Sequence, residues 1–214
     1  MQEDKKQVNR NKVMKNIFYQ LQVAGIIALA LILSGCNTRQ ASKSVNSLKE
    51  AFAGKFYIGT ALNEDQILEK DTAAVRIVKK HFNAVVAENC MKSGPLQPKE
   101  GVFDFTLADK FVDFGEKYNL FITGHTLVWH AQTPPWFFRD SLGKDVTREV
   151  LIERMKKHIT TVVGRYKGRV KGWDVVNEAL NDDGSFRKSR FYNIIGEDFI
   201  KLAFQYAHEA DPST

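Results

Sequence analysis

The feature that most constrains the fold of this chain is the regular alternation of short apolar runs and amphipathic segments after Lys55. Strands are predicted over residues 56–61, 83–87, 120–127 and 170–176. The segments that follow them have apolar residues at helical spacing, over 64–80, from Thr106, over 151–166 and over 199–206. Thr106 and Asp109 also predict a capping box at the start of the second helix. Four strand–helix units in series indicate an α/β protein with a parallel sheet.

The number of these units predicts half of a TIM (β/α)8 barrel. A complete barrel has eight strand–helix units in about 250 residues, whereas roughly 160 residues follow Lys55. We therefore expect the N-terminal half of such a barrel, its first four βα units, with the C-terminal half absent. No Gly-x-Gly-x-x-Gly follows the first predicted strand, which disfavours a dinucleotide-binding fold.

The first 36 residues predict an export signal. Lys12 and Lys15 precede a run of eleven apolar residues, Val23 to Leu33, which is too short to span a bilayer. The run ends in Leu33-Ser34-Gly35-Cys36, which resembles the lipobox of bacterial lipoproteins. That resemblance implies a lipidated Cys36 that anchors an exported protein to a bacterial cell membrane, on a periplasmic or cell-surface face. The alternative is an ordinary cysteine after a signal peptide.

A polar segment separates this signal from the predicted domain. Residues 37–52 are rich in Asn, Ser, Lys and Gln and predict a tether, so the domain is expected over 53–214. If Cys36 carries lipid, Cys90 has no disulfide partner within the chain.

The formal net charge of +6 does not indicate a nucleic-acid partner. Half of this charge lies in the first 36 residues, and the other lysines are interspersed with acidic residues. A nucleic-acid-binding surface concentrates basic residues in a patch or stripe. We therefore expect no binding to nucleic acid.

Three polar clusters follow the second, third and fourth predicted strands, over residues 88–92, 124–136 and 173–178. The carboxyl ends of barrel strands carry the active site. The second cluster combines histidine, tryptophan and glutamine, and such aromatic and polar groups bind the apolar faces and hydroxyls of sugars. A metal site at His125 and His130 is disfavoured, because no third ligand lies at a characteristic spacing.

The third cluster ends in Asn177-Glu178. A carboxylic acid at this position is what glycoside hydrolysis requires of its proton donor, although a surface acid that caps the next segment is the alternative. Together the clusters Glu88-Asn89-x-Met91-Lys92, Gly124-His125-Thr126-Leu127-Val128-Trp129-His130-x-Gln132-x-Pro134-x-Trp136 and Trp173-Asp174-Val175-Val176-Asn177-Glu178-Ala179 resemble glycoside hydrolase family 10, the retaining endo-β-1,4-xylanases.

The resemblance implies a role for each matched residue. Glu178 is expected to be the general acid/base, and Asn177 to bond the sugar 2-hydroxyl. His125 and Trp129 are expected to line the subsite of bond cleavage, with Lys92 bonding sugar hydroxyls nearby. The next sugar is expected to bind to Glu88, Asn89 and Gln132, for which loop or helix capping is the alternative. Asp174 is expected to be structural. No cofactor is implied, and the substrate is expected to be xylan or xylo-oligosaccharides.

A retaining glycosidase also needs a carboxylate nucleophile about 5–5.5 Å from the acid/base. The family carries it near the end of the seventh strand, so we expect it beyond Thr214. Asp182 and Asp183 are poor candidates because they lie in a loop with Gly184. The 214-residue chain alone is therefore expected to be inactive. Two other functions stay open, a carbohydrate-binding lipoprotein without catalysis and a barrel β-glucanase or cellulase.

Overall fold

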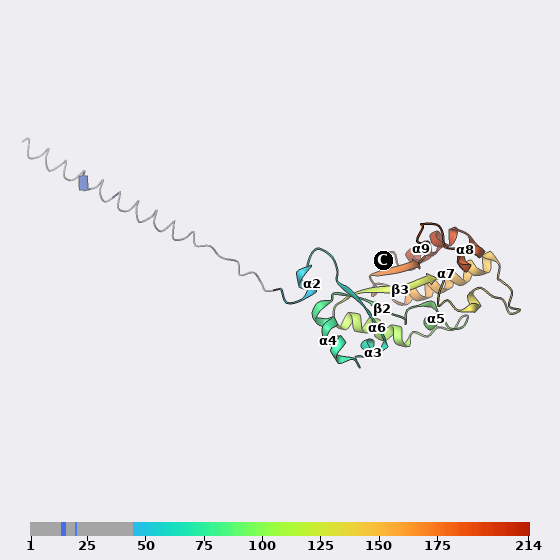
Figure 1. The fold of residues 1–214 in the computed structure, drawn as a ribbon, viewed down its shortest axis with the longest axis horizontal. Helices are drawn as coiled ribbons and strands as arrows, with labels where there is room; N and C mark the ends of the chain where they lie inside the picture. Colours follow the sequence, from blue (N-terminus) through green and yellow to red (C-terminus); the bar gives the residue numbers. More distant parts are fainter. Residues whose placement is uncertain (1–13, 16–19, 21–44) are drawn as a thin grey trace, which may run out of the picture. The chain divides into compact units, whose positions relative to one another are not determined.

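The computed structural model describes residues 14, 15, 20 and 45–214, so the predicted export signal and Cys36 lie outside the described part. Residues 45–214 form one compact unit around a four-stranded parallel sheet of order β1-β2-β3-β4. The strands are β1 (Gly59–Leu62), β2 (Ala84–Ala87), β3 (Phe121–Trp129) and β4 (Gly172–Asn177). All three pairings are parallel, as the four predicted strand–helix units require (Figure 1).

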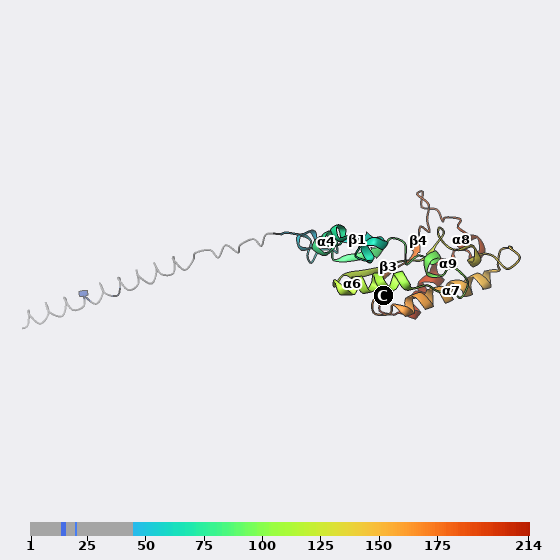
Figure 2. The same ribbon diagram turned by 90° about the horizontal axis from the view of Figure 1, so that it is seen from below.

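Helices connect the strands. After β1 come α3 (Glu64–Ile67) and α4 (Thr72–His81), and after β2 come α5 (Ser93–Leu96) and α6 (Thr106–Lys117). A 3₁₀ turn, η1 (Pro135–Phe137), and the long α7 (Arg148–Arg165) follow β3, and α8 (Arg190–Ile195) and α9 (Asp198–Ala210) follow β4. Figure 2 shows α6 and α7 on the same side of the sheet. The core between sheet and helices includes the fully buried Ile122, Phe111 and Ile159.

The single helix predicted over 64–80 is wrong, because two helices occupy this segment. Leu68 is the C-cap of α3, and Glu69 then adopts a left-handed backbone with φ of 58°. The Asp71 side chain accepts a hydrogen bond from the backbone N–H of Ala74 at 3.0 Å and so caps the start of α4. A side-chain cap of this kind satisfies an otherwise unpaired N–H and starts a new helix within the apolar pattern.

The capping box predicted at Thr106 and Asp109 is also wrong. Thr106 is the first residue of α6, and its N–H donates to the Asp104 side chain at 2.9 Å. The carboxylate of Asp109 instead accepts hydrogen bonds from Arg165 and Tyr166. The tertiary partners on α7 therefore compete successfully for the side chain that the local pattern assigned to the cap.

A short helix, α2 (Leu48–Ala51), lies in the part of the predicted tether that the structure describes. It contacts the end of α4, where the Leu48 N–H donates to Nδ1 of His81 at 3.3 Å and Lys49 Nζ donates to the Lys79 carbonyl at 2.7 Å. Among the described residues, no helix has the length and apolar character needed to cross a membrane.

The pairing of β3 with β4 positions the residues of the predicted site. Gly124 pairs with Trp173, and a Cβ at position 124 would overlap the Trp173 indole, so only glycine permits this close approach. The register shifts between His125 and Val128 and then places Trp129 opposite Asn177. Both strands thus end at the same level, and Glu178 follows directly beside Trp129.

Candidate active site

Glu178 is in contact with two residues from the end of β3. The indole Nε1–H of Trp129 donates to Oε2 of Glu178 at 3.0 Å. Nε2 of His130 lies 3.5 Å from the same oxygen. The Glu178 side chain, just past the end of β4, is 47% exposed to solvent. Both contacts go to Oε2, and within residues 45–214 Oε1 makes no hydrogen bond.

The backbone of Glu178 adopts the left-handed conformation, with φ of 51°. Non-glycine residues rarely adopt this region, and such residues cluster at functional sites. Gln132, another predicted site residue, has φ of 54°. Two turns at the same edge of the sheet are therefore held in conformations that their sequences do not favour locally.

His125 and Asp174 form a second contact between the two strands. Nδ1 of His125 lies 2.9 Å from Oδ2 of Asp174, and the two residues are direct partners in the strand pairing. The Thr126 hydroxyl donates to the Asp174 carbonyl at 2.7 Å, and the peptide bond between His125 and Thr126 is cis. Because a carboxylate only accepts hydrogen bonds, this contact assigns the proton of a neutral imidazole to Nδ1.

Lys92 links the loop after β2 to this cluster. Its Nζ donates to Oδ1 of Asn89 at 3.0 Å and lies 5.0 Å from the centroid of the Trp129 ring, a cation–π distance. Only 9% of the Lys92 residue is exposed. The ammonium group of this nearly buried residue contacts one amide and one aromatic ring, and it has further donors for the hydroxyls of a ligand.

In the part of the chain that the structure describes, the other predicted site residues make no side-chain hydrogen bond to Glu178. Asn177 is half-buried at the end of β4. Glu88 and Gln132 are exposed, and within residues 45–214 their side chains make no hydrogen bond. The loop that carries Gln132 approaches α5 closely, because a Cβ at Gly94 would lie 2.9 Å from the Gln132 carbonyl oxygen.

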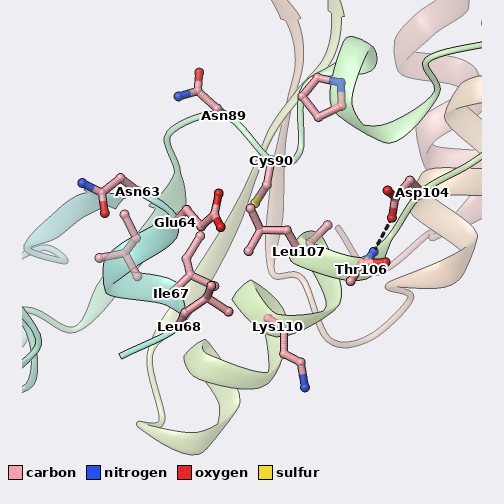
Figure 3. A pocket seen from close by; sticks show the side chains of 13 residues that line it. Asn63, Glu64, Ile67, Leu68, Asn89, Cys90, Asp104, Thr106, Leu107 and Lys110 are labelled. Carbon is pink, nitrogen blue, oxygen red and sulfur yellow. Dashed lines mark hydrogen bonds between the residues drawn. The ribbon is translucent and has the colours of Figure 1, made fainter. Parts of the chain in front are cut away.

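A pocket of about 600 Å³ opens beside this edge of the sheet, between α3, the loop after β2 and the start of α6 (Figure 3). Asn89 lies at its rim and the buried Cys90 in its wall. Burial raises the pKa of the Cys90 thiol to about 12, so this cysteine stays protonated and poorly nucleophilic. Over the ranges that the structure describes, no group of three or more His, Cys, Asp or Glu side chains is placed to hold a metal ion.

Comparison with known proteins identifies the family. The sequence profile of glycosyl hydrolase family 10 matches residues 47–214. The chain belongs to this family. The match begins at the N-cap of α2, which agrees with the contact of that helix with α4.

Similar family 10 proteins carry names that describe xylan hydrolysis. Endo-1,4-beta-xylanase A of Xylanibacter ruminicola is 54% identical over 78% of this chain and 45% of its own length. An endo-1,4-beta-xylanase of Geobacillus stearothermophilus is 51% identical over 79% of this chain and 50% of its own length. The chain thus spans about half the length of these curated relatives.

The solved structures give the same result for the fold. A family 10 endoxylanase from a sugarcane soil metagenome superposes with a TM-score of 0.75 at 46% identity, over 78% of this chain and 49% of the other. A mutant of an intracellular xylanase of Thermoanaerobacterium saccharolyticum, in complex with xylotetraose, gives 0.75 at 45% identity, over 80% and 55%. The fold is the N-terminal half of an α/β barrel, as predicted.

The structure adds three residues to the predicted site. His130 lies beside the Glu178 carboxylate, Asp174 holds His125, and Arg187 contacts the Glu178 backbone. Asp174 could have been considered from the sequence, because it is an acid three residues before Asn177 on the same predicted strand. Arg187 carries no comparable signal, because its contact depends on how the chain turns back after β4.

Proposed function

We propose that the whole protein is a retaining endo-β-1,4-xylanase in which this chain supplies the acid/base half of the active site. The observation that carries the proposal is the position of Glu178, just past the end of β4, with its Oε2 accepting a hydrogen bond from Trp129. A family 10 barrel needs such a carboxylic acid at this point to protonate the departing glycosidic oxygen.

The residues around Glu178 support the two roles expected of it. In the first step the protonated carboxyl donates to the leaving oxygen, and in the second the carboxylate removes a proton from the attacking water. The Trp129 N–H bond at 3.0 Å keeps Oε2 in place through both steps. Nε2 of His130, at 3.5 Å, lies beside the same oxygen.

The neighbouring cluster supports binding of the sugar whose bond is cleaved. His125 is oriented by Asp174, so its Nε2 can accept a hydrogen bond from a sugar hydroxyl. Lys92 offers an ammonium group beside the Trp129 ring, and Asn89 extends the polar surface toward the pocket of Figure 3. We propose that Asn89, Glu88 and Gln132 hold the next sugar, and that Asn177 bonds the 2-hydroxyl.

The nucleophile belongs, in this proposal, to the half of the family 10 barrel that the chain does not span. An assay of the full-length protein on xylan tests the proposal directly, with cellulose and mixed-linkage glucan as comparison substrates. We expect release of xylo-oligosaccharides with retained anomeric configuration. Glu178→Ala should reduce the rate about 10³-fold or more, and Glu197→Ala, at an exposed position near the start of α9, should leave it unchanged.

Three results would each overturn part of the proposal. Binding to xylan without hydrolysis would favour a carbohydrate-binding lipoprotein, and a preference for β-glucan would favour a glucanase. Hydrolysis of xylan by the isolated 214-residue chain would show that the nucleophile lies within it.

We also propose that the protein is exported and anchored to a bacterial membrane through lipid on Cys36. Support comes from the sequence Leu33-Ser34-Gly35-Cys36 after an apolar run. More than one acyl chain is needed for stable anchoring, which lipoprotein processing supplies. Metabolic labelling with palmitate should mark the wild type but not Cys36→Ser, and the variant should leave the membrane fraction. Equal labelling of both proteins would contradict the anchor.

A further inference from the structure

The chain after β4 turns back on itself and brings Arg187 beside Glu178. Leu180 and Phe186 form an antiparallel bridge, and the Asn181 N–H donates to the Ser185 carbonyl at 2.8 Å. The turn between them is closed by Gly184, whose φ of 80° suits glycine. This small hairpin, residues 180–186, returns the backbone to the end of β4.

Arg187 donates hydrogen bonds to three successive carbonyl groups after β4. Its side-chain Nε donates to the Glu178 carbonyl at 2.9 Å, and Nη2 donates to the Leu180 carbonyl at 3.3 Å. Its backbone N–H donates to the Ala179 carbonyl between them at 2.8 Å. A guanidinium group has a rigid fork of donors, so it can hold two carbonyls in a fixed relative position, which a lysine cannot do.

These contacts fall on the segment whose backbone is unfavourable. Glu178 has φ of 51°, in the left-handed region that L-residues other than glycine rarely adopt. A return to extended backbone would redirect the Glu178 side chain away from Trp129 Nε1, the donor that fixes Oε2. The Arg187 bonds to the carbonyls on either side of Ala179 are present only when the chain keeps this turn.

We propose that Arg187 is a positioning residue for the acid/base, which holds the left-handed turn at Glu178 and thereby aims its carboxyl at the leaving oxygen. The inference rests on the proposed function of Glu178. Arg187 acts through the backbone of Glu178. It therefore affects the steps in which Glu178 transfers a proton, and it leaves the other steps unchanged.

The leaving group separates these two kinds of step. Cleavage of xylotetraose requires a proton on the departing sugar oxygen, whereas departure of 2,4-dinitrophenolate from its xylobioside does not. The value of kcat/KM reports only the steps up to the first bond cleavage, so later proton removal from water does not enter. We would measure both substrates with the full-length protein and count active sites from the dinitrophenolate burst.

For Arg187→Met we expect kcat/KM per active site to fall about 30-fold on xylotetraose and less than about 3-fold on the dinitrophenyl substrate. The kcat/KM of Arg187→Lys on xylotetraose should lie between the values for the wild type and for Arg187→Met. Lys188→Met is the matched control, because it removes the same charge from the same segment while its side chain lies over Tyr192. It should match the wild type on both substrates.

Other outcomes would contradict either the role of Arg187 or the proposed function. Equal losses on the two substrates, or no loss on either, would overturn the positioning role of Arg187 while leaving the xylanase activity established. A wild-type protein that hydrolyses neither substrate would overturn the proposed function and, with it, this role of Arg187.

Discussion

His125 and Asp174 are hydrogen-bonded across two neighbouring strands, with Nδ1 of the imidazole 2.9 Å from Oδ2 of the carboxylate. This single contact orients the imidazole and assigns its proton, which leaves Nε2 as an acceptor on the face where a sugar is proposed to bind. Partners of this kind often matter as much as the residue they hold, because they select the tautomer.

The first prediction therefore concerns Asp174→Asn in the full-length protein. The new amide can donate to Nδ1, which would place the imidazole proton on Nε2 and remove the acceptor offered to the sugar. We expect kcat/KM on xylo-oligosaccharides to fall about 10-fold or more, with little change in thermal stability. Steady-state kinetics and a melting curve measure the two effects.

Asp182→Asn makes the matched control for this substitution. Asp182 is an exposed acid in the hairpin 180–186, so the same chemical change there should leave kcat/KM within about 2-fold of the wild type. Similar losses in both variants would mean that the His125–Asp174 bond has no special role.

A second prediction separates the N–H of Trp129 from its ring. Trp129→Phe keeps an aromatic surface but removes the donor that lies 3.0 Å from Glu178 Oε2. We expect kcat on xylan to fall about 10-fold, because the carboxyl group loses its fixed orientation. Trp136→Phe removes an N–H that donates to the Gln97 carbonyl at 3.1 Å, so it should reduce stability and spare kcat. A loss of kcat in Trp136→Phe but not in Trp129→Phe would contradict the role of the Trp129 N–H.

The fold could be predicted from the sequence to the extent that it depends on local patterns. The strand β2 lies within its predicted range because a short apolar run between polar segments leaves few alternatives. The break between α3 and α4 could not be predicted in this way. Ile67, Val75 and Val78 are buried on both sides of it, so the apolar pattern continues while the backbone turns at Glu69.

The contacts of the candidate site also divide into those that follow from local motifs and those that depend on the fold. The proximity of Trp129 to Glu178 could be predicted because their motifs lie at the ends of neighbouring strands. The contact of Arg187 with the Glu178 backbone could not, since Arg187 lies nine positions later in the chain and a hairpin brings it back. Asp174 was expected to be structural, and only the strand register shows that it is a direct partner of His125.

A third prediction concerns the pH dependence of stability. His158 on α7 is fully buried between Phe103 and Phe137, and Nδ1 lies 2.9 Å from Oε1 of Gln97. Within the described residues its Nε2 has no hydrogen-bond partner. Burial lowers the pKa of His158 to about 4, against 6.5 for an ordinary histidine.

The direction of the effect follows from proton binding. Between pH 6.5 and 4 the unfolded chain binds a proton at His158 and the folded protein does not, so acidification favours unfolding. The contribution is complete above pH 6.5 and is lost as the pH falls toward 4, by at most roughly 3 kcal/mol.

Urea unfolding at pH 7, 5.5 and 4.5 measures this loss in the wild type and in two variants. His158→Gln should show a smaller decrease in the free energy of unfolding across this range, whatever its stability at pH 7. His208→Gln removes an exposed histidine from α9 and should keep the wild-type pH dependence. Identical slopes for the wild type and His158→Gln would exclude His158 as the source.

The last prediction tests the close approach of β3 and β4 that aligns the two halves of the site. Gly124→Ala places a methyl group in the volume of the Trp173 indole, so the strands must separate or the indole must move. We expect a loss of about 2 kcal/mol in the free energy of unfolding. Gly164→Ala, in α7, meets no atom within 4 Å and should instead stabilise the protein by about 0.5 kcal/mol through helix propensity.

Because the overlap is with Trp173, a second substitution, Trp173→Phe, should recover part of the loss in Gly124→Ala. Additive losses in the double variant would show that the two residues do not interact.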